Sequence, residues 1–331
     1  WTGLSRLGWD ITELRTGLLA LHGPLMVGGF LGTVIGLERA SALNKPWTYL
    51  APLLSGIGSM IVIFTPYETA GRLLITIGSL WFVIVFTAIL RLQFAAFTVT
   101  MGIGAMLWLV GNIFWLIGYP VDLIAFWWAG FLILTIAGER LDLSRLLSPS
   151  RSSYIIFFSA ITLFLIGVIY STFNPAIGIR ILGLGLLALT VWLVLHDIAT
   201  KTVKMRGLTR FVAVCLLSGY FWLGVSGFFA LFTEKLISGS PMYDATLHAL
   251  FLGFVLAMIF GHAPIIFPAV LQIPILYSPA FYLHFALLEI SLFIRITGNI
   301  SSSTPIVLNS RAIFPLRSED LNPWFIVSPY H

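Results

Sequence analysis

The chain has 331 residues, of which 59% are hydrophobic and only 9% are charged, and its mean hydropathy is +1.00. A soluble domain usually carries about 25% charged residues, so this composition excludes a water-soluble globular protein and indicates a chain that folds inside a lipid bilayer. The net charge of +5 is small and lies mostly in predicted loops, which suits orientation in a membrane better than nucleic-acid binding.

A helix that crosses a bilayer needs about 20 mostly apolar residues. Ten stretches of the chain meet this requirement, and charged residues or prolines mark most of their ends. We therefore predict an all-α fold, a polytopic transmembrane helical bundle of about ten helices, in which residues 1–298 form a single domain. In chain order, the predicted spans are residues 17–37, 47–65, 73–90, 95–118, 121–138, 154–172, 176–195, 210–232, 245–271 and 278–298.

Two stretches differ from the predicted spans. Residues 299–331 contain four prolines and show no helical periodicity, so we expect an irregular extramembrane tail. The stretch GERLDLSRLL at residues 138–147 is amphipathic, and we expect it to form a loop that lies on the membrane surface.

Lysines and arginines are distributed unevenly over the two sides of the predicted bundle. If the N-terminus lies outside, the inner loops hold ten basic residues and the outer side holds five before the tail is counted. Because cytoplasmic loops carry the excess of basic residues, we expect the N-terminus outside and the chain in the cell (inner) membrane. The ten inner residues are Arg39, Lys45, Arg91, Arg140, Arg145, Arg151, Lys201, Lys204, Arg206 and Arg210.

Four histidines lie inside predicted spans, where an ionisable residue is costly and indicates function. His22 is in the first span, His248 and His262 are in the ninth, and His284 is in the tenth. The alternating direction of the helices places His22 and His248 near the outer side and the other two near the inner side. His248 and His262 are separated by roughly 21 Å along a helix, so they cannot share one metal ion.

Two histidine pairs at different depths suit haem. A bis-histidine haem b needs imidazoles from two facing helices, and each pair meets that requirement. We therefore expect one haem b between His22 and His248, with a second haem or copper as a weaker expectation at His262 and His284. The alternative is that each histidine bonds a neighbouring helix or lines a polar cavity.

Two acidic residues accompany the histidines. Asp244 precedes His248 by one helical turn, so it either orients the imidazole or caps the helix end. Glu289 lies in the middle of the tenth span, where it either relays protons or bonds a quinone, or instead pairs with Arg295 or a neighbouring backbone group.

The first span also contains a run of small residues below His22. Small residues at a spacing of four let helices approach closely, but on the face of His22 they would also leave space for a flat macrocycle. The sequence leaves both readings open. The residues are Gly28, Gly29, Gly32, Thr33 and Gly36.

Two segments resemble known haem-binding helices. LHGPLMVGGF (21–30) resembles the low-spin-haem helix of haem-copper oxidase subunit I, and YDATLHALFLGFVLAMIFG (243–261) resembles the later helix that supplies the opposite axial ligand. The pattern is more closely similar to the NnrS family, which are polytopic haem- and copper-associated membrane proteins linked to nitric oxide metabolism. The best point of contact is the pattern at His248, Gly253 and Met258.

The resemblance implies that His22 and His248 are haem ligands. It also has a limit, because the oxidase helix carries a second histidine two residues before the matched one. Thr246 stands at that position here, so the ligand of the oxidase catalytic haem is missing, and a paired His-His for copper is also not seen. Both departures argue against an oxygen reductase.

The function expected from these features is electron transfer or redox chemistry involving nitric oxide, with electrons from a quinone or a redox partner subunit. Two other classes stay open. A permease without a cofactor would use the buried Glu289 and the helix kinks at Pro264 and Pro268. A structural subunit of a respiratory membrane complex would bind no cofactor and would co-purify with partners.

Overall fold

The computed structural model describes residues 17–233, 236, 239–271 and 276–303. Over this part of the chain the secondary structure is helical, without a strand. Nine of the described helices are long and apolar enough to cross a membrane. Another continuous helical run, from Leu18 to Leu43, combines 3-10, α and π turns; we call it the first rod. The prediction of an all-α bundle of about ten helices is confirmed.

The observed helices follow the predicted spans within a few residues at most ends, because hydropathy and span length report the same physical requirement. The first rod consists of η1 (Leu18–Leu21), α2 (His22–Pro24), η2 (Leu25–Leu31) and α3 (Gly32–Leu43). The remaining elements are η3 (Pro46–Tyr49), α4 (Leu50–Phe64), α5 (Glu68–Leu92), α6 (Ala96–Leu116), α7 (Val121–Ser144), η4 (Arg145–Leu147), α8 (Arg151–Ser171), α9 (Pro175–His196), α10 (Ala199–Thr202), α11 (Gly207–Phe232), α12 (Pro241–His248), η5 (Ala249–Leu256), α13 (Ala257–Leu271) and α14 (Phe281–Ser303).

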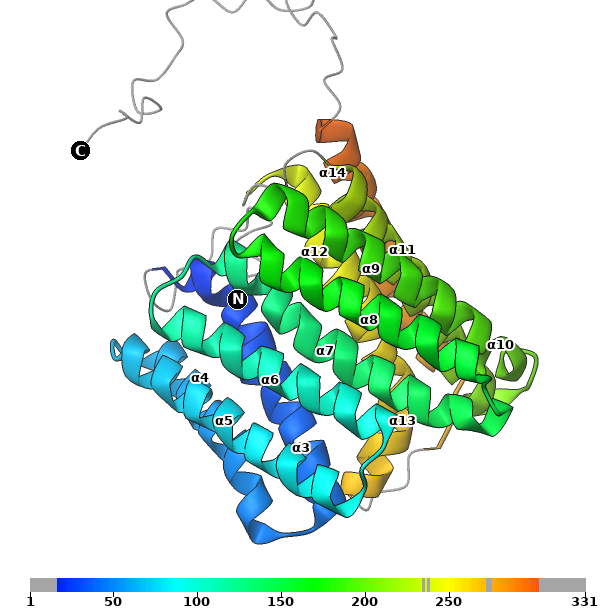
Figure 1. Cartoon of the computed structure of the whole chain (residues 1–331), viewed down its shortest axis with the longest axis horizontal. Helices are drawn as coiled ribbons and strands as arrows, with labels where there is room; N and C mark the ends of the chain where they lie inside the picture. Colours follow the sequence, from blue (N-terminus) through cyan, green and yellow to red (C-terminus); the bar gives the residue numbers. More distant parts are fainter. Residues whose placement is uncertain (1–16, 234–235, 237–238, 272–275, 304–331) are drawn as a thin grey trace, which may run out of the picture.

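The rods lie side by side, with α4 and α5 at one edge and α9 and α11 toward the other (Figure 1). Short connections make successive helices antiparallel neighbours. Rods that are distant in the chain also pack together. The first rod, α7 and the α12–η5–α13 rod contact one another, and we call this region the seam. These three rods run in the same direction, because an even number of antiparallel steps separates them.

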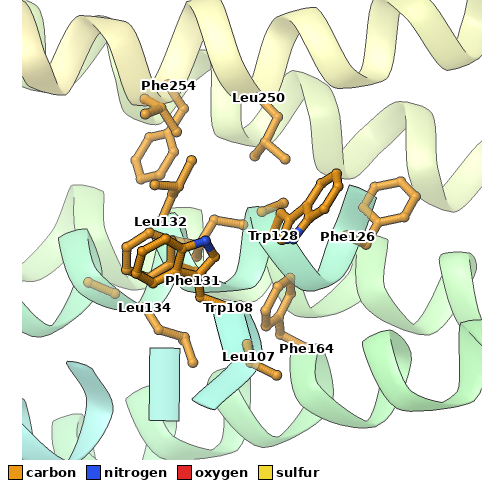
Figure 2. Close-up of a cluster of buried hydrophobic side chains, with 14 of the residues drawn as sticks. Leu107, Trp108, Phe126, Trp128, Phe131, Leu132, Leu134, Phe164, Leu250 and Phe254 are labelled. Carbon is orange, nitrogen blue, oxygen red and sulfur yellow. The ribbon is translucent and has the colours of Figure 1, made fainter. Parts of the chain in front are cut away.

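The centre of the bundle is α7, of which 78% of the membrane-spanning window is buried. Figure 2 shows large side chains of α6, α7, α8 and η5 gathered there. The rings of Trp108 and Phe131 stack with centroids 4.9 Å apart. Gly32 of the first rod faces the Trp108 ring so closely that a Cβ would overlap it, so this glycine lets the first rod reach the core.

The small residues of the first rod serve helix packing. A Cβ on Gly29 would meet the Ser59 side chain, and a Cβ on Gly36 would touch Pro52, both on α4. Of the two readings left open by the sequence, close approach of helices is therefore the one that the structure shows. The face with these glycines has no room for a macrocycle.

The expected surface loop at residues 138–147 is wrong, because α7 continues through Ser144. Arg140 is only 3% exposed. Its charge is compatible with the bundle interior because Asp197 and His262 face it, as described below. A second boundary also moves: α14 continues to Ser303, so residues 299–303 are helical, whereas the rest of the predicted tail (304–331) lies outside the described residues.

Candidate functional site: a cavity between two histidines

A cavity of about 640 Å³ lies where the first rod, α7, α12, η5 and α14 meet. Its volume falls inside the range of roughly 300–1,000 Å³ that is typical of small-molecule and cofactor sites. Both His22 and His248 line it. The structure therefore brings together the first pair that the sequence singled out. We call it the paired-histidine cavity; its lining includes Gly23, Met26, Trp128, Asp244, Phe251 and Arg295.

Each histidine stands next to a π-helical segment. His22 precedes η2 by three residues, and His248 is followed at once by η5. A π turn carries an extra residue and shifts the faces of a helix, and such turns are frequent at functional sites. These segments were not predicted, because π turns change the backbone hydrogen-bond register without a characteristic composition.

The start of α12 fixes the height of His248. The Ser240 hydroxyl accepts a hydrogen bond from the backbone N–H of Tyr243 at 3.2 Å, and Pro241 occupies the first turn. A serine that caps a helix and is followed by proline is a strong signal for the start of that helix. His248 then lies two turns into the rod, at the level of the cavity.

The imidazole of His248 is oriented by Asp244. Its Nδ1 donates to the backbone carbonyl of Asp244 at 2.8 Å and lies 3.2 Å from the carboxylate oxygen Oδ1. These acceptors assign the ring proton to Nδ1 and leave the Nε2 lone pair for a ligand. Carboxylate–histidine pairs of this kind fix the tautomer and raise the basicity of metal ligands.

Asp244 is itself held in place from α14. Arg295 donates to both carboxylate oxygens, from Nε and Nη2 at 2.9 Å each. The amide of Asn299 donates to Oδ2 at 2.7 Å. Of the alternatives for Asp244, the structure favours orientation of the imidazole. The possible pairing of Arg295 with Glu289 is wrong.

His22 is half-buried and lines the same cavity from the first rod. At the next residue, Gly23, no atom of the described residues lies within 4 Å of the position that a Cβ would take. Beside His22 the cavity is therefore open, in contrast to the packed glycines farther along the rod. Trp128, on the α7 wall, is held by a 3.0 Å hydrogen bond from its indole N–H to Asn112.

His262 lines a different cavity, of about 270 Å³, between α3, α7 and α13. Its Nε2 lies 2.7 Å from Nη2 of Arg140, and its Nδ1 lies 2.7 Å from the carbonyl oxygen of Met258. The guanidinium can only donate, so His262 is neutral with its proton on Nδ1. We call this space the His262 cavity.

His284 has an exposed side chain on α14 and lines neither cavity. The buried residues of α14 are Phe285, Leu292 and Ile296, which define a face that His284 does not share. The structure therefore does not bring His262 and His284 together. Depth along the chain placed them at a similar level, but it did not report the direction of each side chain.

Arg140 belongs to a buried polar cluster that the sequence did not indicate. Its guanidinium is 4.0 Å from the Asp197 carboxylate, and both side chains are almost fully buried. Asp197 also accepts from the backbone N–H of Ala199 at 2.7 Å, at the start of α10. The Tyr220 hydroxyl lies buried beside this pair. A usable sequence signal was the absence of proline or glycine in the stretch after residue 138.

Glu289 lies outside both cavities. Its Oε2 accepts a hydrogen bond from the indole N–H of Trp222 on α11 at 2.7 Å. His196 stacks on Trp192, with ring centroids 5.0 Å apart. Among the described residues, there is no group of three or more His, Cys, Asp or Glu side chains placed to hold a metal ion.

Comparison with known proteins gives a family but no activity. No curated protein and no solved structure matches the chain. One family matches residues 1–312, which is nearly the whole sequence. The chain therefore belongs to the family described as domain of unknown function DUF8744.

Proposed function

We propose that this integral membrane protein binds one haem b between His22 and His248 and acts in electron transfer or in redox chemistry of nitric oxide. The observation that carries the proposal is that imidazoles from two separate rods line one cavity of cofactor size. The likeness of the same two segments to NnrS and oxidase helices supports the proposal.

The cavity suits the group by its volume and by the chemistry of its lining. Its walls include Met26, Trp128 and Phe251, which suit an apolar macrocycle. Asp244 holds the His248 ring with Nε2 available as a ligand. Arg295 also lines the cavity, and the guanidinium hydrogens that Asp244 does not accept would suit the carboxylates of a porphyrin.

His22 and His248 would hold the haem, which would supply reversible one-electron transfer. The chain's own contribution is to position the ligands. Asp244 would increase the electron donation of His248 and so favour the oxidised state of a bound metal. Electrons would come from a membrane quinone or a redox partner subunit.

The proposal is limited to one haem. A second haem or copper at His262 and His284 would need side chains that share a site, and these two do not share a cavity. The excess of basic residues in one set of loops supports the inner membrane and an outer N-terminus, and both stay proposals.

The test is an optical spectrum of the detergent-purified protein, oxidised and reduced, with haem quantified as the pyridine haemochrome. We expect sharp reduced α and β bands and one haem per chain. If the protein purifies without colour, titration with haemin should saturate at one equivalent. A folded protein that neither carries nor takes up haem would contradict the proposal and favour a permease or a structural subunit.

A further inference from the structure

The His262 cavity has apolar walls and ionisable groups on three rods. Glu38 on α3, Glu139 on α7 and His262 on α13 all line it. Because these rods run in the same direction and each residue lies late in its rod, the three groups gather toward one end. Arg39 also forms a salt bridge with Glu139, which gives that carboxylate a charged partner within the bundle.

The same cavity meets the surface that faces lipid. Phe30, Leu37 and Phe267 line it and also have exposed side chains. On a membrane-spanning bundle such apolar residues contact acyl chains, so a molecule dissolved in the bilayer reaches the cavity without passing through water. The expected ligand is therefore lipid-soluble.

An acyl chain alone does not match the polar end. Ionisable side chains inside a membrane are costly and are retained where a partner or a ligand uses them. A hydrocarbon tail would leave the two carboxylates facing apolar matter. A ligand with an apolar body and a small hydroxylated head satisfies both ends.

The His262 cavity lies next to the paired-histidine cavity. Leu31 lines both, so a single buried side chain of the first rod is part of the wall between them. The seam between the first rod, α7 and the α12–η5–α13 rod therefore contains two cavities, and Leu31 lines both. A molecule in the His262 cavity would lie next to anything bound between the histidines.

From these observations we infer that the His262 cavity binds the head group of a lipid-soluble quinol. The quinol hydroxyls donate hydrogen bonds to the carboxylates of Glu38 and Glu139, and the alkyl or isoprenoid chain leaves past Phe30 and Phe267. A quinone has only carbonyl oxygens and cannot donate, so the reduced form binds more tightly. Binding stands on this cavity alone, whereas a role as electron donor rests on the proposed function.

The test is photolabelling of the purified protein in lipid nanodiscs with an azido-substituted quinone, followed by peptide mapping. We expect label on the α3 and α13 residues that line the cavity. Decylubiquinol should compete for the site, at least about tenfold better than decylubiquinone, while a fatty acid of matched length should not. Equal competition by the fatty acid would show a lipid-tail cavity and overturn the inference, as would label elsewhere.

Substitutions test whether the labelling occurs in the His262 cavity. Val34→Trp fills the cavity mouth and should abolish labelling, whereas Val191→Trp, at an exposed position of α9 outside both cavities, should leave it unchanged. Glu38→Gln should weaken competition by decylubiquinol about tenfold, since the acceptor of the quinol hydrogen bond loses its charge. Full labelling of the Val34→Trp protein would contradict the assignment.

A haem-free variant separates this inference from the proposed function. His22→Ala/His248→Ala removes two side chains that line only the paired-histidine cavity, so labelling should persist. Labelling of an unmodified protein that neither carries nor takes up haem would overturn the proposed function and leave the quinol site standing. Haem without labelling would have the reverse meaning.

Discussion

The two cavities of the seam are built from the same three rods but present their histidines differently. In the paired-histidine cavity, His248 donates from Nδ1 to Asp244 and leaves Nε2 as a ligand atom. In the other cavity, His262 has both ring nitrogens engaged, one by Arg140 and one by a backbone carbonyl. These two histidines lie on one rod, but only His248 has a ring nitrogen left to act as a ligand atom.

This difference shows that the role of an imidazole depends on which groups contact its two ring nitrogens. A carboxylate one turn away prepares the opposite nitrogen for a metal. A guanidinium at Nε2 occupies that same nitrogen and ties the ring to a buried charge cluster instead. The proposed cofactor site therefore lies at one end of the seam, and the buried charge cluster lies at the other.

The largest expected effect tests the ligand pair. His22→Ala or His248→Ala should reduce the haem content from one per chain to nearly none, because a single remaining imidazole holds the haem from one side only. The pyridine haemochrome assay on purified, folded protein measures this. His284→Ala is the matched control, since His284 is exposed and lines neither cavity, and it should retain full haem.

The next effect concerns the buried cluster. Arg140→Met should destabilise the protein by about 3–5 kcal/mol, because Asp197 is left as an unpaired buried charge. Denaturant titration in mixed micelles reports the change, and haem per folded chain should stay constant.

Arg145→Met is the control for this substitution, since Arg145 is 52% exposed and pairs with Asp142 at the end of α7. Exposed ion pairs are worth about 0–1 kcal/mol, so a small loss is expected. Equal losses for Arg140→Met and Arg145→Met would remove the distinction between the cluster and the surface.

A smaller effect sharpens the role of Asp244. Asp244→Ala should weaken haem affinity about 10–100-fold, which is the usual consequence of losing an outer partner of a ligating histidine. Haemin titration of the apoprotein measures it. Asp122→Ala is the comparison variant, because Asp122 lines the same cavity. An equal loss there would show that cavity charge, not imidazole orientation, is responsible.

The smallest effect concerns Glu289. Glu289→Gln keeps a carbonyl oxygen to accept from Trp222, so stability should change by less than about 1 kcal/mol and haem should be unaffected. Thermal unfolding and the haem spectrum check both. A large loss of haem would show that Glu289 contributes to the haem site.

Much of the fold was predictable because a membrane imposes a length on each apolar stretch. The rods containing His22 and His248 and their shared level followed from helix alternation. The link between Asp244 and His248 followed from helical spacing, because residues four apart share a face.

The remainder depends on contacts between distant residues. The Arg140–His262 bond joins positions 122 residues apart, and nothing near Arg140 in the sequence indicates it. The exposed direction of His284 depends on how α14 is rotated against its neighbours. The π-helical segments beside the two histidines change backbone geometry without a compositional mark.

The most direct test of the central claim is the near-infrared magnetic circular dichroism spectrum of the oxidised haem protein, which reports the axial ligand pair. We expect a single low-spin signal of the bis-imidazole type, and a histidine–methionine signal in His22→Met. A high-spin signal in the unmodified protein, or a bis-imidazole signal that persists in His22→Met, would contradict haem ligation between His22 and His248.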